Sequence, residues 1–284
     1  MASYLWRCRG RRIELGRRTL IMGILNITPD SFSDGGRYFS GAAALAGARE
    51  LVAAGADILD VGGESTRPGS VPVSVEEEME RILPVLTTLR RNLDIPLSVD
   101  TYKAAVAEAA LAAGADIIND ISGLTFDAGM AALVARSGAG LVLMHIQGTP
   151  RDMQLNPWYE DVIAEVSRFL KHQLAMAEAA GVGRDQIVLD PGIGFGKRLE
   201  DNLILLRDLG CFESLGLPLL VGPSRKSFIG RILDLPVSER VEGTAAAVTA
   251  AILNGARLVR VHDVRPMARV VRVADAIRCG RLEP

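Results

Sequence analysis

Cysteine is scarce in this sequence, with three residues among 284. Cys8, Cys211 and Cys279 lie far apart, and no two of them form a C-x-x-C pair. An odd number of separated cysteines argues against both a disulfide framework and a structural zinc site. The spacing favours a reducing compartment, so we expect the protein in the cytoplasm.

Long hydrophobic runs and an excess of charge are also missing. No segment has the run of about 18 apolar residues that a membrane-spanning helix would need, and residues 1–18 are basic without the apolar stretch of a signal peptide. The 32 basic residues nearly balance the 34 acidic ones, for a formal net charge of −2. Neither a nucleic acid nor a membrane is therefore an expected partner, and any anion site must be local.

The sequence does contain short apolar runs separated by longer Ala-rich segments of helical period. The runs span residues 20–25, 58–61, 97–99, 117–118, 141–144, 187–189, 219–221 and 258–261. Strands of a parallel sheet are buried on both faces and read as continuous Val, Ile and Leu. Eight such runs predict an α/β fold, a (β/α)8 TIM barrel that occupies residues 1–284 as one domain. Residues 4–15 are expected to form a short N-terminal hairpin that closes the bottom of the barrel.

Two features of the helical segments carry structural expectations. Ser74 and Glu77 have the spacing of a capping box, which predicts the start of a helix. Pro84 lies ten residues beyond Ser74, and because proline removes a backbone donor we expect this helix to kink or to end early.

Polar side chains follow the apolar runs, at the point where each predicted strand ends. Active sites of such barrels are assembled at the carboxyl ends of the strands, so these side chains predict one site. They divide into two chemical sets. The first is a cationic, donor-rich group suited to phosphate or pyrophosphate, in which the Asn can also offer an oxygen to Mg²⁺: Asn26, Arg67, Arg260 and His262. The second includes carboxylates that can accept paired hydrogen bonds from a heterocycle such as guanine or a pterin: Asp100, Asn119, Asp190 and Lys226.

Seven motifs closely resemble the bacterial dihydropteroate synthase family. The longer ones are MGILNITPDSFSDGG at residues 22–36, DVGGESTRPG at 60–69 and LDPGIGFGK at 189–197. The shorter ones are SVDT at 98–101, IND at 118–120, SRKS at 224–227 and RVHD at 260–263. They occur in order and at compatible spacing between residues 20 and 279.

The resemblance implies a reaction and its ligands. A transferase of this family joins 6-hydroxymethyl-7,8-dihydropterin pyrophosphate to p-aminobenzoate, which gives 7,8-dihydropteroate for folate biosynthesis and releases pyrophosphate. It implies Mg²⁺ as the cofactor, sulfonamides as inhibitors and a homodimer. Residues 31–40 and 64–74 are rich in Gly, Ser and Pro and lie above the predicted barrel, so we expect them to order only when pyrophosphate or pterin is bound.

The resemblance also implies a role for each site residue. Asp100, Asn119, Ile121, Met144, Asp190, Phe195 and Lys226 would bind the pterin. Asn26, Thr66, Arg67, Arg260 and His262 would bind the pyrophosphate, with Asn26 as the ligand of Mg²⁺. Phe32, Thr66, Pro68, Lys226 and Ser227 would contact p-aminobenzoate. The catalytic group would be Asp100, Lys226, Arg67, Arg260 and His262.

Two other functions share part of this pattern. A methyltetrahydrofolate methyltransferase would keep the pterin pocket but needs no pyrophosphate site, so Arg67, Arg260 and His262 argue against it. A non-catalytic pterin-binding paralogue would keep the pocket without the chemistry, and Asn26 and Ser227 argue against that. Single residues also remain open. Arg225 and His145 can be structural or can contact ligand, and Pro223 can reshape the wall near p-aminobenzoate by fixing the backbone there.

Overall fold

The computed structural model describes residues 3–27 and 41–281, and within them eight parallel strands form one sheet. The strands are β3 (Leu20–Asn26), β4 (Ile58–Gly62), β5 (Leu97–Asp100), β6 (Ile117–Asp120), β7 (Gly140–Met144), β8 (Ile187–Asp190), β9 (Leu220–Val221) and β10 (Leu258–Val261). Their order is β8-β7-β6-β5-β4-β3-β10-β9, and a parallel bridge between Leu189 and Leu219 joins the two ends. The predicted (β/α)8 barrel is confirmed, since each apolar run forms one strand.

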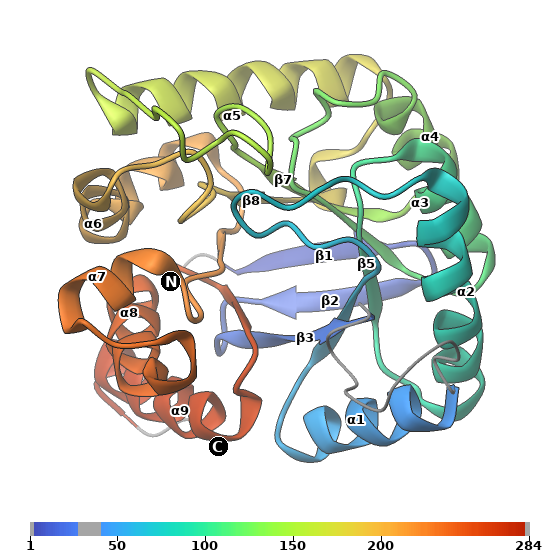
Figure 1. Cartoon of the computed structure of the whole chain (residues 1–284), viewed down its shortest axis with the longest axis horizontal. Coiled ribbons are helices and arrows are strands. Elements are labelled where there is room, and N and C mark those ends of the chain that lie inside the picture. Colours follow the sequence, from blue (N-terminus) through green and yellow to red (C-terminus); the bar gives the residue numbers. More distant parts are fainter. Residues whose placement is uncertain (1–2, 28–40, 282–284) are drawn as a thin grey trace.

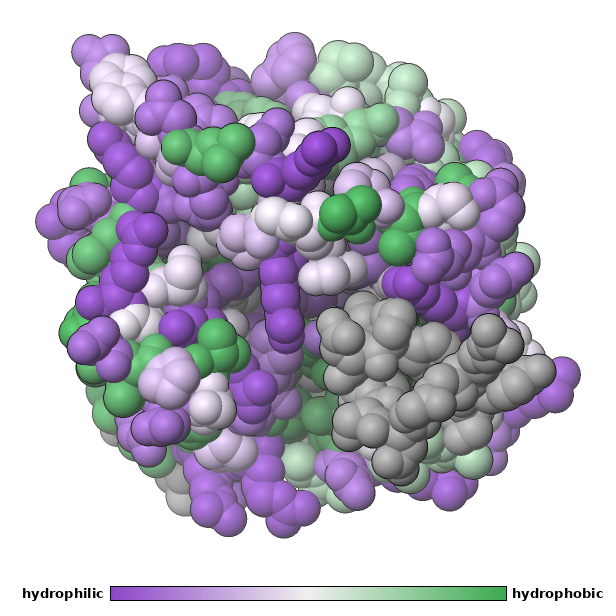
Figure 2. All heavy atoms as spheres, in the orientation of Figure 1, coloured by the Kyte–Doolittle hydropathy of each residue, from purple (hydrophilic) through white to green (hydrophobic). Residues whose placement is uncertain are grey.

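Helices surround this ring of strands (Figure 1). They are α1 (Gly41–Ala53), α2 (Val75–Asn92), α3 (Ala104–Ala112), α4 (Met130–Ser137), α5 (Val162–Ala179), α6 (Leu199–Arg207), α7 (Ser227–Leu233), α8 (Val241–Leu253) and α9 (Val264–Cys279). None of the helices in the described ranges is long and apolar enough to cross a membrane. On the face seen in Figure 2, hydrophobic residues are scattered among hydrophilic ones.

Helix α2 begins as predicted and continues further than predicted. The Ser74 side chain accepts a hydrogen bond from the Glu77 backbone N–H at 3.1 Å, which caps the first turn. The expectation that Pro84 kinks or ends this helix early is wrong about its end, because α2 runs unbroken to Asn92. Pro84 lies on the exposed side of the helix, where water can satisfy the carbonyl that loses its partner.

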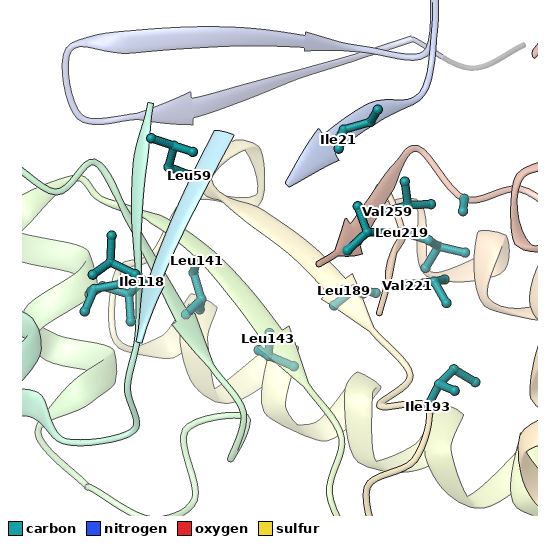
Figure 3. Packing of buried hydrophobic residues seen from close by; sticks show 14 of the residues in the cluster. Ile21, Leu59, Ile118, Leu141, Leu143, Leu189, Ile193, Leu219, Val221 and Val259 are labelled. Atoms are coloured by element: carbon teal, nitrogen blue, oxygen red, sulfur yellow. The ribbon is translucent and has the colours of Figure 1, made fainter. Parts of the chain in front are cut away.

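The strands bury side chains on both faces, in two separate clusters. Residues that point outward pack against the helices, and Figure 3 shows some of them, among them Leu59, Ile118 and Leu141. A second cluster fills the amino-terminal end of the barrel interior. Its members from the strands are Leu20, Met22, Ile58, Ile117, Val142, Val188, Leu220 and Leu258. The period of two in a strand is what separates the clusters.

An antiparallel hairpin packs into this second cluster and closes the bottom of the barrel, as predicted. It consists of β1 (Tyr4–Cys8) and β2 (Arg11–Leu15). Trp6 is 1% exposed and donates its indole N–H to the Gln186 carbonyl at 2.7 Å. Gly140 leaves room for the hairpin, because a Cβ there would lie 2.5 Å from the Cys8 sulfur.

Replacing Trp6 with Ala should lower the free energy of unfolding by about 3–5 kcal/mol, because it leaves a cavity in a closed cluster and an unpaired carbonyl at Gln186. Urea denaturation of the variant and the wild type measures the difference. Leu5→Ala is the matched control on the same strand: Leu5 is 46% exposed, so its loss should be about 1 kcal/mol or less. Equal losses in both variants would contradict the role of Trp6.

Candidate active site

Inside the barrel, the side chains change from apolar at the amino-terminal end to polar at the next inward-facing position of the strands. Two residues beyond the apolar layer, β4, β6, β8 and β10 each carry a polar side chain: Asp60, Asn119, Asp190 and Arg260. Asp60 joins two of the others, since it accepts hydrogen bonds from Asn119 at 3.0 Å and from Arg260 at 2.6 Å. The carboxyl end of the barrel therefore holds a polar floor above an apolar plug.

Arg260 is the centre of this floor. Its guanidinium also donates to Asp100 at 2.6 Å, so one cation binds the carboxylates of Asp60 and Asp100. All three side chains are buried or nearly so. Burial raises the pKa of Asp100 to about 7 even though Arg260 opposes the shift. Near neutral pH the second carboxylate can therefore take up a proton, which leaves the cluster close to electrically neutral.

Asp190 and Lys226 lie on the other side of the barrel mouth. Asp190 ends β8 and accepts a hydrogen bond from the Gly192 N–H at 2.7 Å. Burial raises its pKa to about 6 and lowers that of Lys226 to about 8. The Lys226 ammonium lies 3.9 Å from the centre of the Phe195 ring, a cation–π contact that partly offsets its burial. A carboxylate, a cation and an aromatic ring thus line one wall of the mouth.

An apolar group completes this wall. Ile121, Met144 and Phe195, the three residues expected to pack on a pterin ring, belong to one small buried cluster. Ile146 and Met153 are its other buried members, and Tyr102 packs against it. The structure therefore brings the apolar and polar residues assigned to the pterin to the same end of the barrel.

His262 contributes a neutral ring and no positive charge. Burial, with Arg260 nearby, lowers its pKa to about 3. Its Nδ1 lies 3.0 Å from the Ser224 hydroxyl, which itself accepts the His262 backbone N–H at 3.2 Å. This pair of contacts fixes the orientation of the neutral ring. The first set of predicted residues is therefore less cationic than expected.

The remaining predicted residues lie at the rim. Thr66, Arg67 and Pro68 are in the segment between β4 and α2, with Arg67 and Pro68 exposed. Among the contacts of the described residues, none joins the Arg67 side chain to Arg260 or His262. Ser227 is exposed at the first position of α7. Phe32 lies outside the described residues.

Asn26 ends β3 close to the polar floor. A Cβ placed on Gly62 would lie 3.8 Å from both the Asn26 Oδ1 and the Asp100 Oδ2. The two oxygens thus flank the same glycine. No group of three or more His, Cys, Asp or Glu residues that could hold a metal occurs in residues 3–27 and 41–281.

Arg225 and His145 both have structural partners. The Arg225 guanidinium forms two hydrogen bonds with the Asp263 carboxylate, at 2.8 and 2.6 Å. His145 Nδ1 lies 2.9 Å from the Lys197 amine, which also donates to the Phe195 carbonyl at 3.0 Å. These contacts favour the structural interpretation of both residues. Pro223 keeps a regular turn, since its carbonyl accepts the Lys226 N–H at 3.3 Å.

Sequence reasoning missed Asp60 and Lys197. Asp60 lies inside an apolar run, and the signal was a charged residue two positions after Ile58, where the side chain must point inward. Lys197 ends the LDPGIGFGK motif, but only its burial at 2% exposure reveals that it supports the wall from behind.

Comparisons with known proteins agree with this arrangement. The family model described as "Pterin binding enzyme" matches residues 22–262. A dihydropteroate synthase of Synechocystis is 54% identical over 265 residues, which covers 93% of this chain and 92% of the relative. The chain belongs to the dihydropteroate synthase family.

Solved structures of the dihydropteroate synthase family have the same fold as this chain. The Yersinia pestis enzyme with a sulfonamide drug complex has a TM-score of 0.91 and 43% identity, covering 97% of this chain and 99% of that one. The Xanthomonas albilineans enzyme with 4-aminobenzoic acid also has a TM-score of 0.91, with 45% identity over 98% of this chain and 99% of that one.

Replacing Asp190 with Asn should stabilise the ligand-free protein at neutral pH. Because the pKa of Asp190 is raised to about 6 from 3.8, the native state binds more protons than the unfolded state between these values, and stability falls as pH rises through them. The gain in Asp190→Asn should be absent near pH 4, grow up to about pH 6 and reach roughly 1–3 kcal/mol above it, since one pKa unit corresponds to about 1.4 kcal/mol.

Denaturant unfolding of Asp190→Asn and the wild type across this pH range measures the effect. Asp185→Asn is the matched control, because Arg7 lowers the pKa of that exposed carboxyl. The control should lose stability at neutral pH, the opposite sign. A gain in Asp190→Asn that does not change with pH would contradict the assignment.

Proposed function

We propose that this chain condenses 6-hydroxymethyl-7,8-dihydropterin pyrophosphate with p-aminobenzoate to give 7,8-dihydropteroate and pyrophosphate. The observation that carries the proposal is the 54% identity to a dihydropteroate synthase over nearly the whole chain. The residues of the polar floor and the apolar wall at the barrel mouth would bind the two substrates. The assay below separates this function from that of a methyltetrahydrofolate methyltransferase or a non-catalytic paralogue, since neither would form dihydropteroate.

The pterin would lie deepest in the mouth. Its ring would pack against Met144 and Phe195, which belong to the buried apolar cluster. Asp190 would accept hydrogen bonds from the amino group and the adjacent ring N–H. Its raised pKa supports this role, because donors from the substrate would replace the hydration that the buried carboxylate lacks.

The reaction breaks the C–O bond to pyrophosphate and forms a C–N bond from the amine of p-aminobenzoate, which then loses a proton. Negative charge grows on the leaving pyrophosphate, while positive charge develops on the pterin methylene. Arg260 and the neutral ring of His262 would stabilise the leaving group, with Arg67 reaching it from the rim. Asp100 in its ionised form would stabilise the cationic pterin. The reaction needs no nucleophilic side chain of the protein.

Mg²⁺ is part of the proposal. Asn26 would supply one oxygen, and pyrophosphate with water would supply the others, which suits an ion that keeps much of its hydration shell. The fit is supported by the position of Asn26 Oδ1 beside Gly62 at the edge of the polar floor. The bound ion would neutralise charge on the leaving group.

The second substrate would bind nearer to solvent. Thr66, Pro68, Lys226 and Ser227 would contact p-aminobenzoate, together with Phe32. The relative from Xanthomonas albilineans was solved with 4-aminobenzoic acid and that from Yersinia pestis with a sulfonamide drug complex. These two complexes support p-aminobenzoate as the substrate and sulfonamides as competing inhibitors.

Location and assembly complete the proposal. Cys8, Cys211 and Cys279 are all free thiols, which supports the cytoplasm as the working compartment. A homodimer is proposed through the outer helices. Val273 and Ile277 lie one turn apart on the same face of α9 and are each 61% exposed, and a contiguous apolar patch of this kind favours a partner surface.

A coupled assay tests the function. Purified protein with dihydropterin pyrophosphate, p-aminobenzoate and Mg²⁺ should release pyrophosphate and form dihydropteroate in equal amounts, and both products are measured in the same reaction. Release of pyrophosphate without dihydropteroate would refute the synthase, and absence of both products would favour either a binding paralogue or the methyltransferase.

Two variants separate the roles of the floor and the wall. Asp190→Ala should weaken binding of a pterin without pyrophosphate about 100-fold, because the pterin amino group and ring N–H lose their charged acceptor. Arg260→Ala should weaken pyrophosphate binding, and it should weaken pterin binding as well, because it leaves the carboxylates of Asp60 and Asp100 without their cation. Calorimetric titration measures both ligands. Unchanged pterin binding in Arg260→Ala would contradict the shared floor.

A further inference from the structure

A second buried charge cluster lies beside the mouth and outside the group of residues assigned to ligands. Lys103, just after β5, donates to Glu64 at 2.5 Å and to Glu78 of α2 at 2.6 Å. Glu64 and Glu78 are 7% and 1% exposed. One cation thus pairs with two buried carboxylates from different parts of the chain, and buried charges that are held in this way are sensitive to the loss of one partner.

The cluster ties together the two ends of the segment at residues 64–74. Glu64 stands at its start, and Val73 stands near its end. The Val73 N–H donates to Glu64 at 3.2 Å, and the Val73 carbonyl accepts from Lys103 at 2.9 Å. Both backbone groups of Val73 are therefore bound by members of the cluster, which closes the segment into a loop.

Close packing fixes the start of the same loop. A Cβ on Gly63 would lie 2.7 Å from the Ile82 side chain and 3.1 Å from the Glu78 Cγ, so only glycine fits against α2 at this point. The Gly63 carbonyl accepts from Arg81 of the same helix at 2.7 Å. The base of the loop is thus anchored to α2 on one side and to Lys103 on the other.

The middle of the loop reaches over the barrel mouth. Figure 1 shows the segment between β4 and α2 extending from the α2 side across the ring of strands. At its far point the Gly69 N–H donates to the Pro150 carbonyl in the segment after β7, at 2.9 Å. Thr66, Arg67 and Pro68 lie on this crossing part, while the charged cluster holds its base.

Tyr102 connects the cluster to the apolar wall. Its hydroxyl donates to Glu64 at 2.6 Å, and its ring packs against the group that contains Met144 and Phe195. One side chain thus contacts both the wall proposed for the pterin and the anchor of the loop.

We propose that Lys103 is a positioning residue that holds the loop at residues 64–74, through Glu64 and Val73, so that Thr66 and Arg67 meet p-aminobenzoate and pyrophosphate. The inference rests on the function proposed above and assigns Lys103 no contact with substrate. Without Lys103, Glu64 and Glu78 would repel each other and the Val73 carbonyl would lose its partner, which would release the loop from α2.

Replacing Lys103 with Met tests this inference, since Met keeps the length of the side chain without its charge. The KM for p-aminobenzoate should rise about tenfold and kcat should fall, because small displacements of positioning groups reduce rates steeply. The Kd for 6-hydroxymethylpterin, which lacks the pyrophosphate group, should stay within about twofold of the wild type, because the wall is unchanged. Lys103→Arg restores the cation and should recover most of the lost activity.

Controls keep the outcome decisive. Arg136→Met removes a cation from an exposed pair with Glu108 and should leave every constant unchanged. If Lys103→Met does not fold, Tyr102→Phe decides: it removes only the hydroxyl bond to Glu64 and should raise the KM for p-aminobenzoate about threefold, the scale of one hydrogen bond.

Two results would overturn the inference. One is an unchanged KM for p-aminobenzoate in the variant that folds, and the other is an equal loss of pterin and p-aminobenzoate binding, which would mean general destabilisation. A wild type that forms no dihydropteroate would refute the proposed function instead. The wild-type assay therefore distinguishes the two failures before any variant is measured.

Discussion

The ion pairs of Arg260 are the interaction on which the rest of the site depends. One guanidinium holds Asp60 and Asp100 inside the barrel, at 2.6 Å from each. Two carboxylates in so small a buried space repel each other strongly unless a cation or a proton lies between them. Arg260 therefore allows Asp60 and Asp100 to be buried inside the barrel, in a position that apolar side chains would otherwise occupy. It also makes the pterin and pyrophosphate regions electrostatically one site.

The fold was predictable from the sequence because its signal is local. Each strand is a short apolar run, and a run that is buried on both faces can be recognised without any knowledge of its neighbours. The hairpin of residues 4–15 was predicted as well, and its pairing is also local, because only two residues separate its strands. The end of α2 could not be predicted from the sequence. The effect of Pro84 depends on whether its side of the helix is exposed, and tertiary packing decides that exposure.

The site was predictable as a set of residues but not as a set of contacts. The strand ends supplied most of its members, whereas the pairing of Arg260 with Asp60 joins positions 200 residues apart. The charge of His262 was also beyond sequence reasoning, because burial and Arg260 together keep its ring neutral. Lys103 and Lys197 follow no apolar run directly, and only their buried partners show that they matter.

The hairpin that packs into the amino-terminal end of the barrel restricts how ligands can enter and leave. Trp6 and its neighbours fill that end. Within the described residues, a ligand would therefore reach the polar floor from the carboxyl ends of the strands, which the loop anchored by Lys103 partly spans. A ligand seated near these strand ends blocks the way to the polar floor below it. If the pterin binds at the polar floor as proposed, it would therefore have to arrive before the second substrate, and a molecule bound above it would have to leave first.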